Sequence, residues 1–213
     1  MKKVLLEITL ATISISLFAF DWPLQNINTD NLKSFFAQKR GQGISSSLII
    51  EKQKETDPEA EPEQVKTSES GKVIALLNEF TDDNDFFPST LGNAVIISHT
   101  DGILSVYGNL DKNSMETSLH QAQVIAPGAS LGTTGSSAWS DTGTTLEFQI
   151  LDSKNKTAIN PRILLSRIEK EGTFPPSDII VENKDGKHYE LSNMKVFQAW
   201  TYKFFQKRNE SLV

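Results

Sequence analysis

Short apolar runs rich in β-branched residues alternate with turn residues from Lys72 onward. The runs are KVIAL, AVIISH, ILSVYGNL, QVIAP, TTLEFQI, DIIVEN and KHYELS. Runs of this length, bounded by Gly, Pro, Asn and Asp, are typical of strands joined by tight turns. The pattern predicts an all-β domain with an antiparallel β-sheet core and a hairpin around Lys184-Asp185-Gly186. Helix is expected only at the start of the chain and near Thr29–Gln38, and the tail fits strand or helix equally well.

The first twenty residues have the layout of a secretory signal or an N-terminal anchor helix. A basic start, Met1-Lys2-Lys3, precedes the apolar stretch Val4–Phe20, which Glu7 interrupts. This stretch is at the lower length limit for crossing a bilayer, and Glu7 makes a stable span costly, so a signal peptide is favoured. Because Ala19 lies in no A-x-A pattern, an uncleaved anchor stays open. We expect export across the inner membrane to the periplasm or cell envelope, with membrane contact only through an uncleaved segment 1–20.

Residues 51–70 differ in composition from the rest of the chain. They hold seven acidic residues, three lysines and two prolines, and almost no apolar side chain. Such a segment cannot bury enough apolar surface to offset its ordering entropy, so a disordered acidic insertion is expected. The expected organisation is 1–20 as signal or anchor, 21–50 as the N-terminal part of a domain, 51–70 as the insertion, 71–165 as its β core, and 166–213 as a C-terminal extension with the hairpin.

Composition excludes several kinds of chemistry. The formal net charge of -6 and the lack of a dense Lys/Arg cluster argue against nucleic acid as a partner. Without cysteine, the chain has no disulfide, no thiolate metal site and no cysteine nucleophile. The three histidines, His99, His120 and His188, occur in no HxH, HxxxD or HExxH arrangement. The stretch at Gly132–Gly135 lacks the lysine of a phosphate loop, and Asp82–Asp85 lacks the spacing of a calcium loop.

Two segments carry a family resemblance. One reads LGNAVIISHTDGILSVYGNL over 91–110, and the other reads IAPGASLGTTG over 125–135, followed by GTTLEFQI at 143–150 and by Asn160-Pro161. These resemble the LytM/lysostaphin-type zinc endopeptidases of peptidoglycan, which share the duplicated hybrid motif. A further match joins them upstream, at Trp22-Pro23, at FAQKRG over 36–41 and at ISSSLII over 44–50. The resemblance implies an antiparallel β core of the LytM/lysostaphin type over residues 71–165.

The resemblance also implies where a zinc site would stand. In the family, a His and an Asp of an HxxxD segment and the second His of an HxH segment hold zinc, and two further histidines assist. The first ligand His falls on Ser45, the ligand Asp on Ile49, the assisting histidines on Asn109 and Thr145, and the last ligand His on Glu147. Of these five residues, Glu147 alone could bind zinc, and one carboxylate does not make a site.

The resemblance thus implies the framework of the family without its metal ligands. We expect a catalytically inactive LytM-like envelope protein, without a cofactor, that binds peptidoglycan or regulates a cell-wall hydrolase such as an amidase. The opposing class is an active zinc metalloendopeptidase that cleaves peptidoglycan peptide crosslinks, with ligands placed elsewhere than in this alignment.

A groove beside the lost site is the expected contact surface for a partner. Its predicted binding residues are Tyr107, Asn109, Trp139 and Thr145, because Trp139 puts a large amphipathic ring in a small, polar loop. The aromatic stretch Lys195–Phe205 either packs on the domain or forms a second partner surface.

Overall fold

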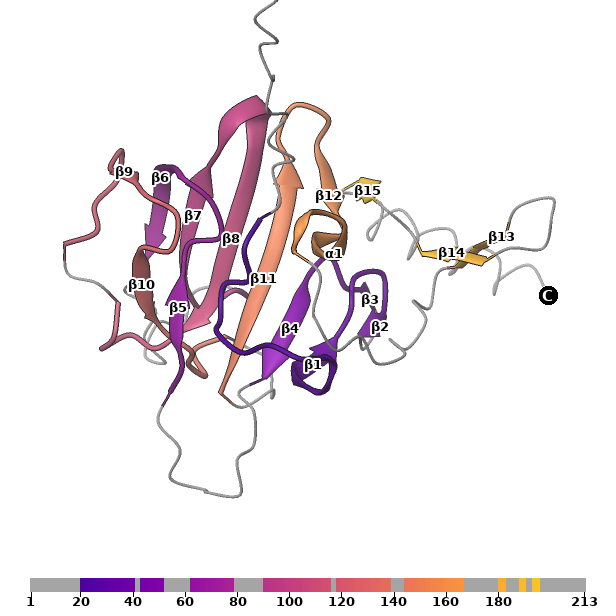
Figure 1. Ribbon diagram of the computed structural model, residues 1–213, viewed down its shortest axis with the longest axis horizontal. Helices are drawn as coiled ribbons and strands as arrows, with labels where there is room; N and C mark the ends of the chain where they lie inside the picture. Colours follow the sequence, from indigo (N-terminus) through magenta and orange to yellow (C-terminus); the bar gives the residue numbers. More distant parts are fainter. Residues whose placement is uncertain are drawn as a thin grey trace, which may run out of the picture.

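An antiparallel sheet dominates the computed structural model of the chain (Figure 1). The structure describes residues 20–40, 43–51, 62–78, 90–115, 118–138, 144–166, 180–182, 188–190 and 193–195. Within these residues, the sheet has the strand order β1 (Leu32–Ser34), β4 (Leu48–Glu51), β11 (Thr145–Asp152), β8 (Ile103–Leu110), β7 (Asn93–Ser98), β6 (Gly71–Leu77) and β9 (Val124–Ile125). At the end of β11, β12 (Thr157–Ile159) pairs with β11, and β15 (Asn193–Lys195) pairs with β12. All of these pairings are antiparallel, which confirms the predicted all-β fold class.

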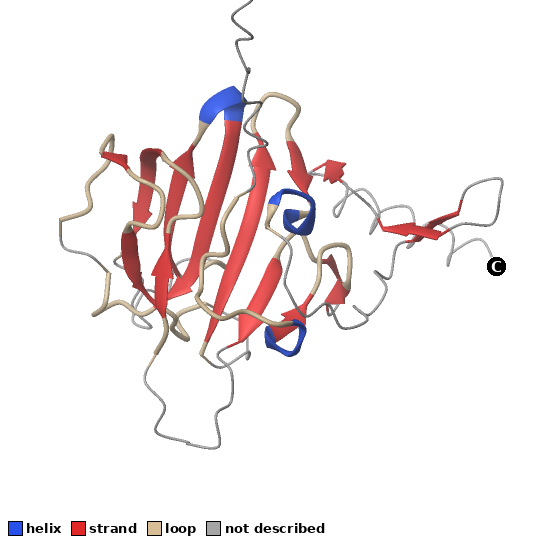
Figure 2. Ribbon diagram, viewed as in Figure 1, coloured by secondary structure: helices blue, strands red, loops and turns tan. Residues whose placement is uncertain are grey.

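The remaining described elements are short. β5 (Gln64–Lys66) pairs with β10 (Ser130–Thr133), β2 (Lys39–Arg40) with β3 (Gly43–Ile44), and β13 (Ile180–Glu182) with β14 (His188–Glu190). Helical segments are the 3₁₀ turns Thr29–Asn31 and Thr100–Gly102 and the helix α1 (Pro161–Leu164). Figure 2 shows how far strand exceeds helix in the described part of the chain. Asn160 caps α1, since its side chain accepts a hydrogen bond from the Arg162 amide.

The helix predicted near Thr29–Gln38 is wrong beyond its first turn. The 3₁₀ turn ends at Asn31, and Leu32 begins β1, which pairs with β4. Leu32 is buried in the main core, and Ala37 has a left-handed φ of 61°, which no α-helix accommodates. Pairing with a buried strand therefore outweighs the local preference of this segment for helix.

One face of the sheet forms the main hydrophobic core. Alternation along β11 sends Leu146, Phe148 and Ile150 to this face, where all three are fully buried. Neighbouring strands add Leu48, Ile50, Val73, Val95, Ile97, Tyr107 and Leu110. The pair β5–β10 covers this face, because Val65 and Leu131 belong to the same cluster. One strand of this pair, β5, thus lies in the segment that the sequence analysis assigns to the insertion.

The predicted insertion 51–70 is too long at both ends. Glu51 closes β4, and Gln64–Lys66 is the strand β5. Val65 is 0% exposed, and the Ser68 amide donates a hydrogen bond of 2.8 Å to the Tyr107 hydroxyl. A single apolar residue, Val65, is enough to anchor this short strand. The average composition of residues 51–70 does not reveal it. Residues 52–61, the rest of this prediction, lie outside the described residues.

Phe20 is part of the folded domain. Phe20 is buried, its amide donates to the Leu164 carbonyl at 2.7 Å, and its carbonyl accepts from the Ser166 amide at 2.9 Å. The Trp22 indole donates to the Ser166 carbonyl at 2.8 Å. Phe20 therefore belongs to the domain and not to the predicted signal or anchor. The other residues of that prediction, 1–19, lie outside the described residues. Among the described helices, none is long and apolar enough to cross a membrane.

Candidate functional site

Strand pairing brings the predicted site positions of β4 and β11 together. Ile49 on β4 lies directly opposite Glu147 on β11, and Glu51 lies opposite Thr145. These residues lie on the side of the two strands away from the main core, since their neighbours Leu48, Ile50, Leu146 and Phe148 point into it. The two positions that the family resemblance assigns to the ligand Asp and the last ligand His are therefore opposite each other in the sheet.

The residues at these positions do not fit a zinc ion. Ile49 offers only a hydrocarbon side chain and is 1% exposed, whereas zinc in proteins takes sulfur, imidazole nitrogen or carboxylate oxygen. Glu147 is a carboxylate, and it accepts a hydrogen bond of 2.9 Å from the Gln149 side chain. The Ser45 hydroxyl bonds locally, to the Ser47 carbonyl at 3.0 Å and to the Ser47 amide at 3.2 Å. Across the described ranges, no group of three or more His, Cys, Asp or Glu residues could hold a metal ion.

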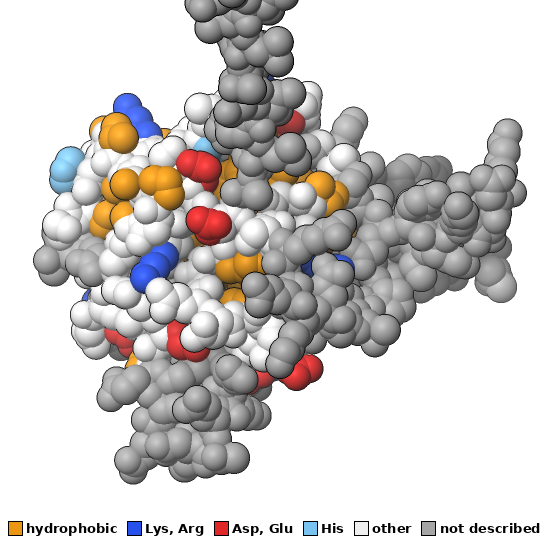
Figure 3. Space-filling model, viewed as in Figure 1, with side chains coloured by type: hydrophobic (Ala, Val, Ile, Leu, Met, Phe, Trp, Pro, Cys, Tyr) orange, Lys and Arg blue, Asp and Glu red, His pale blue; other side chains and the backbone are white. Residues whose placement is uncertain are grey.

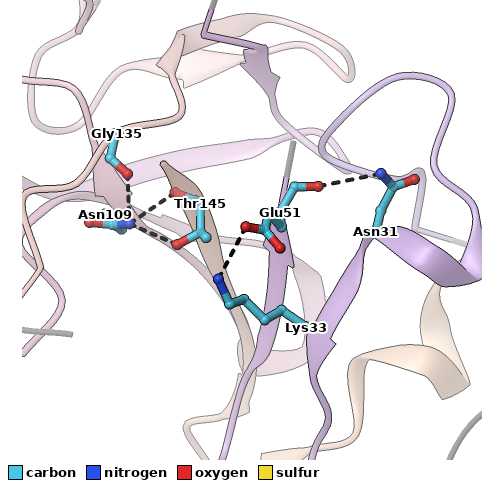
Figure 4. A network of polar contacts seen from close by, with 6 residues as sticks. All are labelled: Asn31, Lys33, Glu51, Asn109, Gly135 and Thr145. Carbon is cyan, nitrogen blue, oxygen red and sulfur yellow. Dashed lines mark hydrogen bonds and ion pairs between the residues drawn. The ribbon is translucent and has the colours of Figure 1, made fainter. Parts of the chain in front are cut away.

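Asn109 and Thr145, to which the family resemblance assigns the assisting histidines, form a hydrogen-bonded polar pair (Figure 4). The Asn109 Nδ2 group lies 2.8 Å from Thr145 Oγ1, 3.0 Å from the Thr145 carbonyl and 2.7 Å from the Gly135 carbonyl. Asn109 and Thr145 are each 1% exposed. Neither side chain is in a position to act as a general base on a bound substrate, because both are buried and hydrogen-bonded to the protein.

An ion pair that the sequence did not indicate lies next to this pair. Lys33 Nζ is 3.1 Å from Glu51 Oε1, and the Asn31 side chain lies 3.4 Å from the Glu51 carbonyl (Figure 4). Both charged side chains are partly exposed, so the pair contributes little to stability. Its members come from β1 and the end of β4, and no local sequence pattern predicts that these strands pair.

The prediction that Tyr107 contacts a partner in the groove is wrong, because its side chain is buried. Its ring is 0% exposed, packs on Phe148 at a centroid distance of 5.3 Å, and belongs to the main core on the other face. Burial raises the pKa of the Tyr107 hydroxyl, which accepts the Ser68 amide hydrogen bond. Asn109 and Thr145 are likewise buried too deeply to meet a partner. Trp139, the fourth predicted binding residue, lies outside the described residues.

The histidines contribute no metal cluster among the described residues. His99 links the residue before β6 to β8, with Nδ1 2.7 Å from the Ser70 carbonyl and Nε2 2.7 Å from Ser105 Oγ, and its ring meets Phe20 edge-on. A backbone carbonyl accepts only, so Nδ1 carries the proton and Nε2 accepts from Ser105. His120 is exposed. His188 lies in β14, and its side chain is outside the described part of the structure.

We expect His99 to make the stability of the domain dependent on pH. Burial lowers the pKa of His99 below its ordinary value of 6.5, against the opposing effects of the Ser70 carbonyl and the Glu69 charge. Below about pH 6.5 the unfolded chain therefore binds more protons than the folded one. The free energy of unfolding should fall as pH decreases from 6.5 through the lowered pKa, and this contribution should be constant above 6.5.

Urea unfolding at pH 7.5 and pH 5.0 tests this prediction, with His99→Gln as the comparison. Gln does not titrate, so the variant should lose less stability than the wild type between the two pH values. An equal loss in both proteins would show that other groups carry the pH dependence.

The charges on the face drawn in Figure 3 are mixed over its described residues. On the face drawn in Figure 3, acidic and basic side chains of the described residues are interspersed among uncharged ones. Over the described part of this face there is no basic stripe of the kind that follows a phosphate backbone.

Comparison with known proteins assigns the chain to a family. The profile of peptidase family M23 matches residues 52–161, just over half of the chain. An uncharacterized protein of Treponema pallidum (strain Nichols) is 29% identical over 123 residues, which are 58% of this chain and 80% of that protein.

Solved structures agree on the fold. A zinc containing peptidase from Vibrio cholerae aligns with a TM-score of 0.50 and 17% identity, over 67% of this chain and 39% of that one. The SpoIIQ–SpoIIIAH pore forming complex has a chain that aligns with a TM-score of 0.51 and 18% identity, over 71% of this chain and 93% of that one. The present match thus spans about two fifths of the Vibrio peptidase. Motif order, sheet topology and the profile match agree with the predicted LytM/lysostaphin resemblance, and the chain belongs to peptidase family M23.

Proposed function

We propose that this chain is a noncatalytic member of the M23 family that binds peptidoglycan or regulates a cell-wall hydrolase, such as an amidase, in the cell envelope. The observation that carries the proposal is Ile49 opposite Glu147. The family resemblance assigns zinc ligands to both of these positions, and the isoleucine side chain cannot bind metal. The buried Asn109–Thr145 pair adds support, because the resemblance assigns the two assisting histidines to these positions, and neither residue carries an imidazole.

A protein partner has independent support from one relative of the fold. SpoIIQ and SpoIIIAH form a pore forming complex, so this fold occurs in a protein assembly. Export to the envelope is part of the proposal and relies on the basic start and apolar stretch of residues 1–20. In that compartment, both peptidoglycan and its hydrolases are within reach of the domain.

Isolated peptidoglycan sacculi provide the test. The purified protein is incubated with sacculi in zinc-supplemented buffer, with and without a cell-wall amidase. Protein in the pellet and soluble muropeptides are then measured. The proposal expects either retention in the pellet or faster release by the amidase, and no release by the protein alone.

Two outcomes would contradict the proposal. Release of cleaved peptide crosslinks by the protein alone, abolished by a chelator, would establish the alternative, an active zinc metalloendopeptidase. Absence of both binding and amidase stimulation would remove peptidoglycan and that hydrolase class as partners.

A further inference from the structure

Asn109 lies where two central strands of the sheet separate. The last pair between β8 and β11 joins Gly108 to Glu147. Beyond it, Leu110 pairs with Thr134 and Thr145 pairs with Gly135. The chain that continues β10 is therefore inserted between β8 and β11, and Asn109 is the last residue of β8 before this split.

The Asn109 side chain bonds to both sides of the split. Its Nδ2 group donates to the Gly135 carbonyl at 2.7 Å and to Thr145 Oγ1 at 2.8 Å. Its Oδ1 atom accepts from the Ala138 amide at 2.7 Å. The orientation of the amide is fixed by these partners, because a carbonyl only accepts and a backbone N–H only donates. We infer that Asn109 is a structural clamp that joins β8, residues 135–138 and β11.

The backbone conformation at position 109 also favours asparagine. Asn109 has a φ of 64°, a left-handed conformation that Asn tolerates better than most residues with a side chain. Its own amide donates to the Leu91 carbonyl at 2.6 Å. A Cβ atom on Gly135 would collide with the backbone of Leu110 and Asp111, so the inserted segment packs tightly against β8. Backbone conformation, close packing and side-chain bonding thus all constrain the junction.

Neither histidine nor aspartate can replace these contacts. A neutral imidazole has one N–H donor and one acceptor, and it cannot donate to both Gly135 and Thr145 while accepting from Ala138. A carboxylate would face two carbonyl oxygens without a proton to donate. The position that the family resemblance assigns to an assisting histidine has therefore become part of the fold. This inference concerns stability and is independent of which partner the domain binds.

Substitutions in the full chain test the clamp. Asn109→Gly removes the bonds and leaves the left-handed backbone unstrained, whereas Asn109→Ala removes the bonds and adds strain. Asn109→Gly should lower the Tm by roughly 10 °C, because it leaves buried polar groups unpaired. Asn109→Ala and Asn109→His should lower it at least as much. Asn113→Ala, at an exposed turn residue, is the matched control and should shift the Tm by less than about 2 °C.

Hydrogen exchange of the Ala138 amide gives a local measurement that does not need a variant to fold. In the wild type this amide should exchange at least about tenfold more slowly than an unprotected amide, because Asn109 Oδ1 accepts its hydrogen. In a folded Asn109→Gly protein, its exchange should become faster. An unprotected Ala138 amide in the wild type would overturn the clamp, and so would an Asn109→Gly protein with the Tm of the wild type.

Discussion

Val65→Asp is expected to prevent the domain from folding. Val65 is 0% exposed on β5 and packs in the main core with residues of the central sheet. An aspartate there would bury a carboxylate without a charged partner or would enter the core protonated. Substitutions of this kind cost about 4 kcal/mol or more, which is a large part of the 5–15 kcal/mol that stabilises an ordinary domain.

Val124→Asp is the matched control for this experiment. Val124 also lies in a short strand of the domain, but it is 78% exposed on β9. Its substitution should leave the Tm within about 2 °C of the wild type. Circular dichroism and thermal melts of both variants give the comparison. A folded Val65→Asp protein of normal Tm would show that residues 62–70 do not pack on the domain.

A chain that starts at Gln25 should be far less stable than one that starts at Phe20. The shorter chain loses the buried side chains of Phe20 and Leu24, worth roughly 3–6 kcal/mol together. It also loses the bonds from the Asp21 amide to the Ser68 carbonyl and from the Lys66 amide to the Pro23 carbonyl. The expected fall in Tm is on the order of 10–20 °C.

The chain that starts at Phe20 is the reference for this comparison. Its new amine stays beside the Leu164 carbonyl, which the Phe20 nitrogen approaches to 2.7 Å. Thermal melts of the two shortened chains measure the difference. Equal melting temperatures for both would show that residues 20–24 do not belong to the folded domain.

The sequence predicted the central strands because their pattern is strong and local. Alternation in TTLEFQI sends Leu146, Phe148 and Ile150 to one face, and β11 follows it. β5 was missed because its single buried residue, Val65, stands in an acidic segment. The helix expected near Thr29–Gln38 does not form beyond its first turn, because Leu32 pairs with Ile50 in the sheet and a local pattern cannot show this pairing.

Only part of the geometry of the candidate site follows from the sequence. The family resemblance assigned Asn109 and Thr145 to the two assisting histidines, and in the structure these residues are in hydrogen-bonding contact. The sequence placed Tyr107 in the predicted groove, but its ring is buried in the main core on the other face of the sheet. The left-handed backbone of Asn109 breaks the regular alternation of side chains at the end of β8, so the two residues cannot be assigned to a face from alternation alone. The bonds from Asn109 to Gly135 and Ala138 join residues more than twenty positions apart, and no local pattern reports them.

The zinc content of the purified protein tests the central claim most directly. The protein is loaded with excess zinc, dialysed against metal-free buffer and analysed by mass spectrometry for metal per chain. Because Ile49 faces Glu147 and no imidazole occupies the aligned positions, the result should be far below one zinc per chain. One zinc retained per chain, and lost on Glu147→Ala substitution, would contradict the account and identify Glu147 as a ligand.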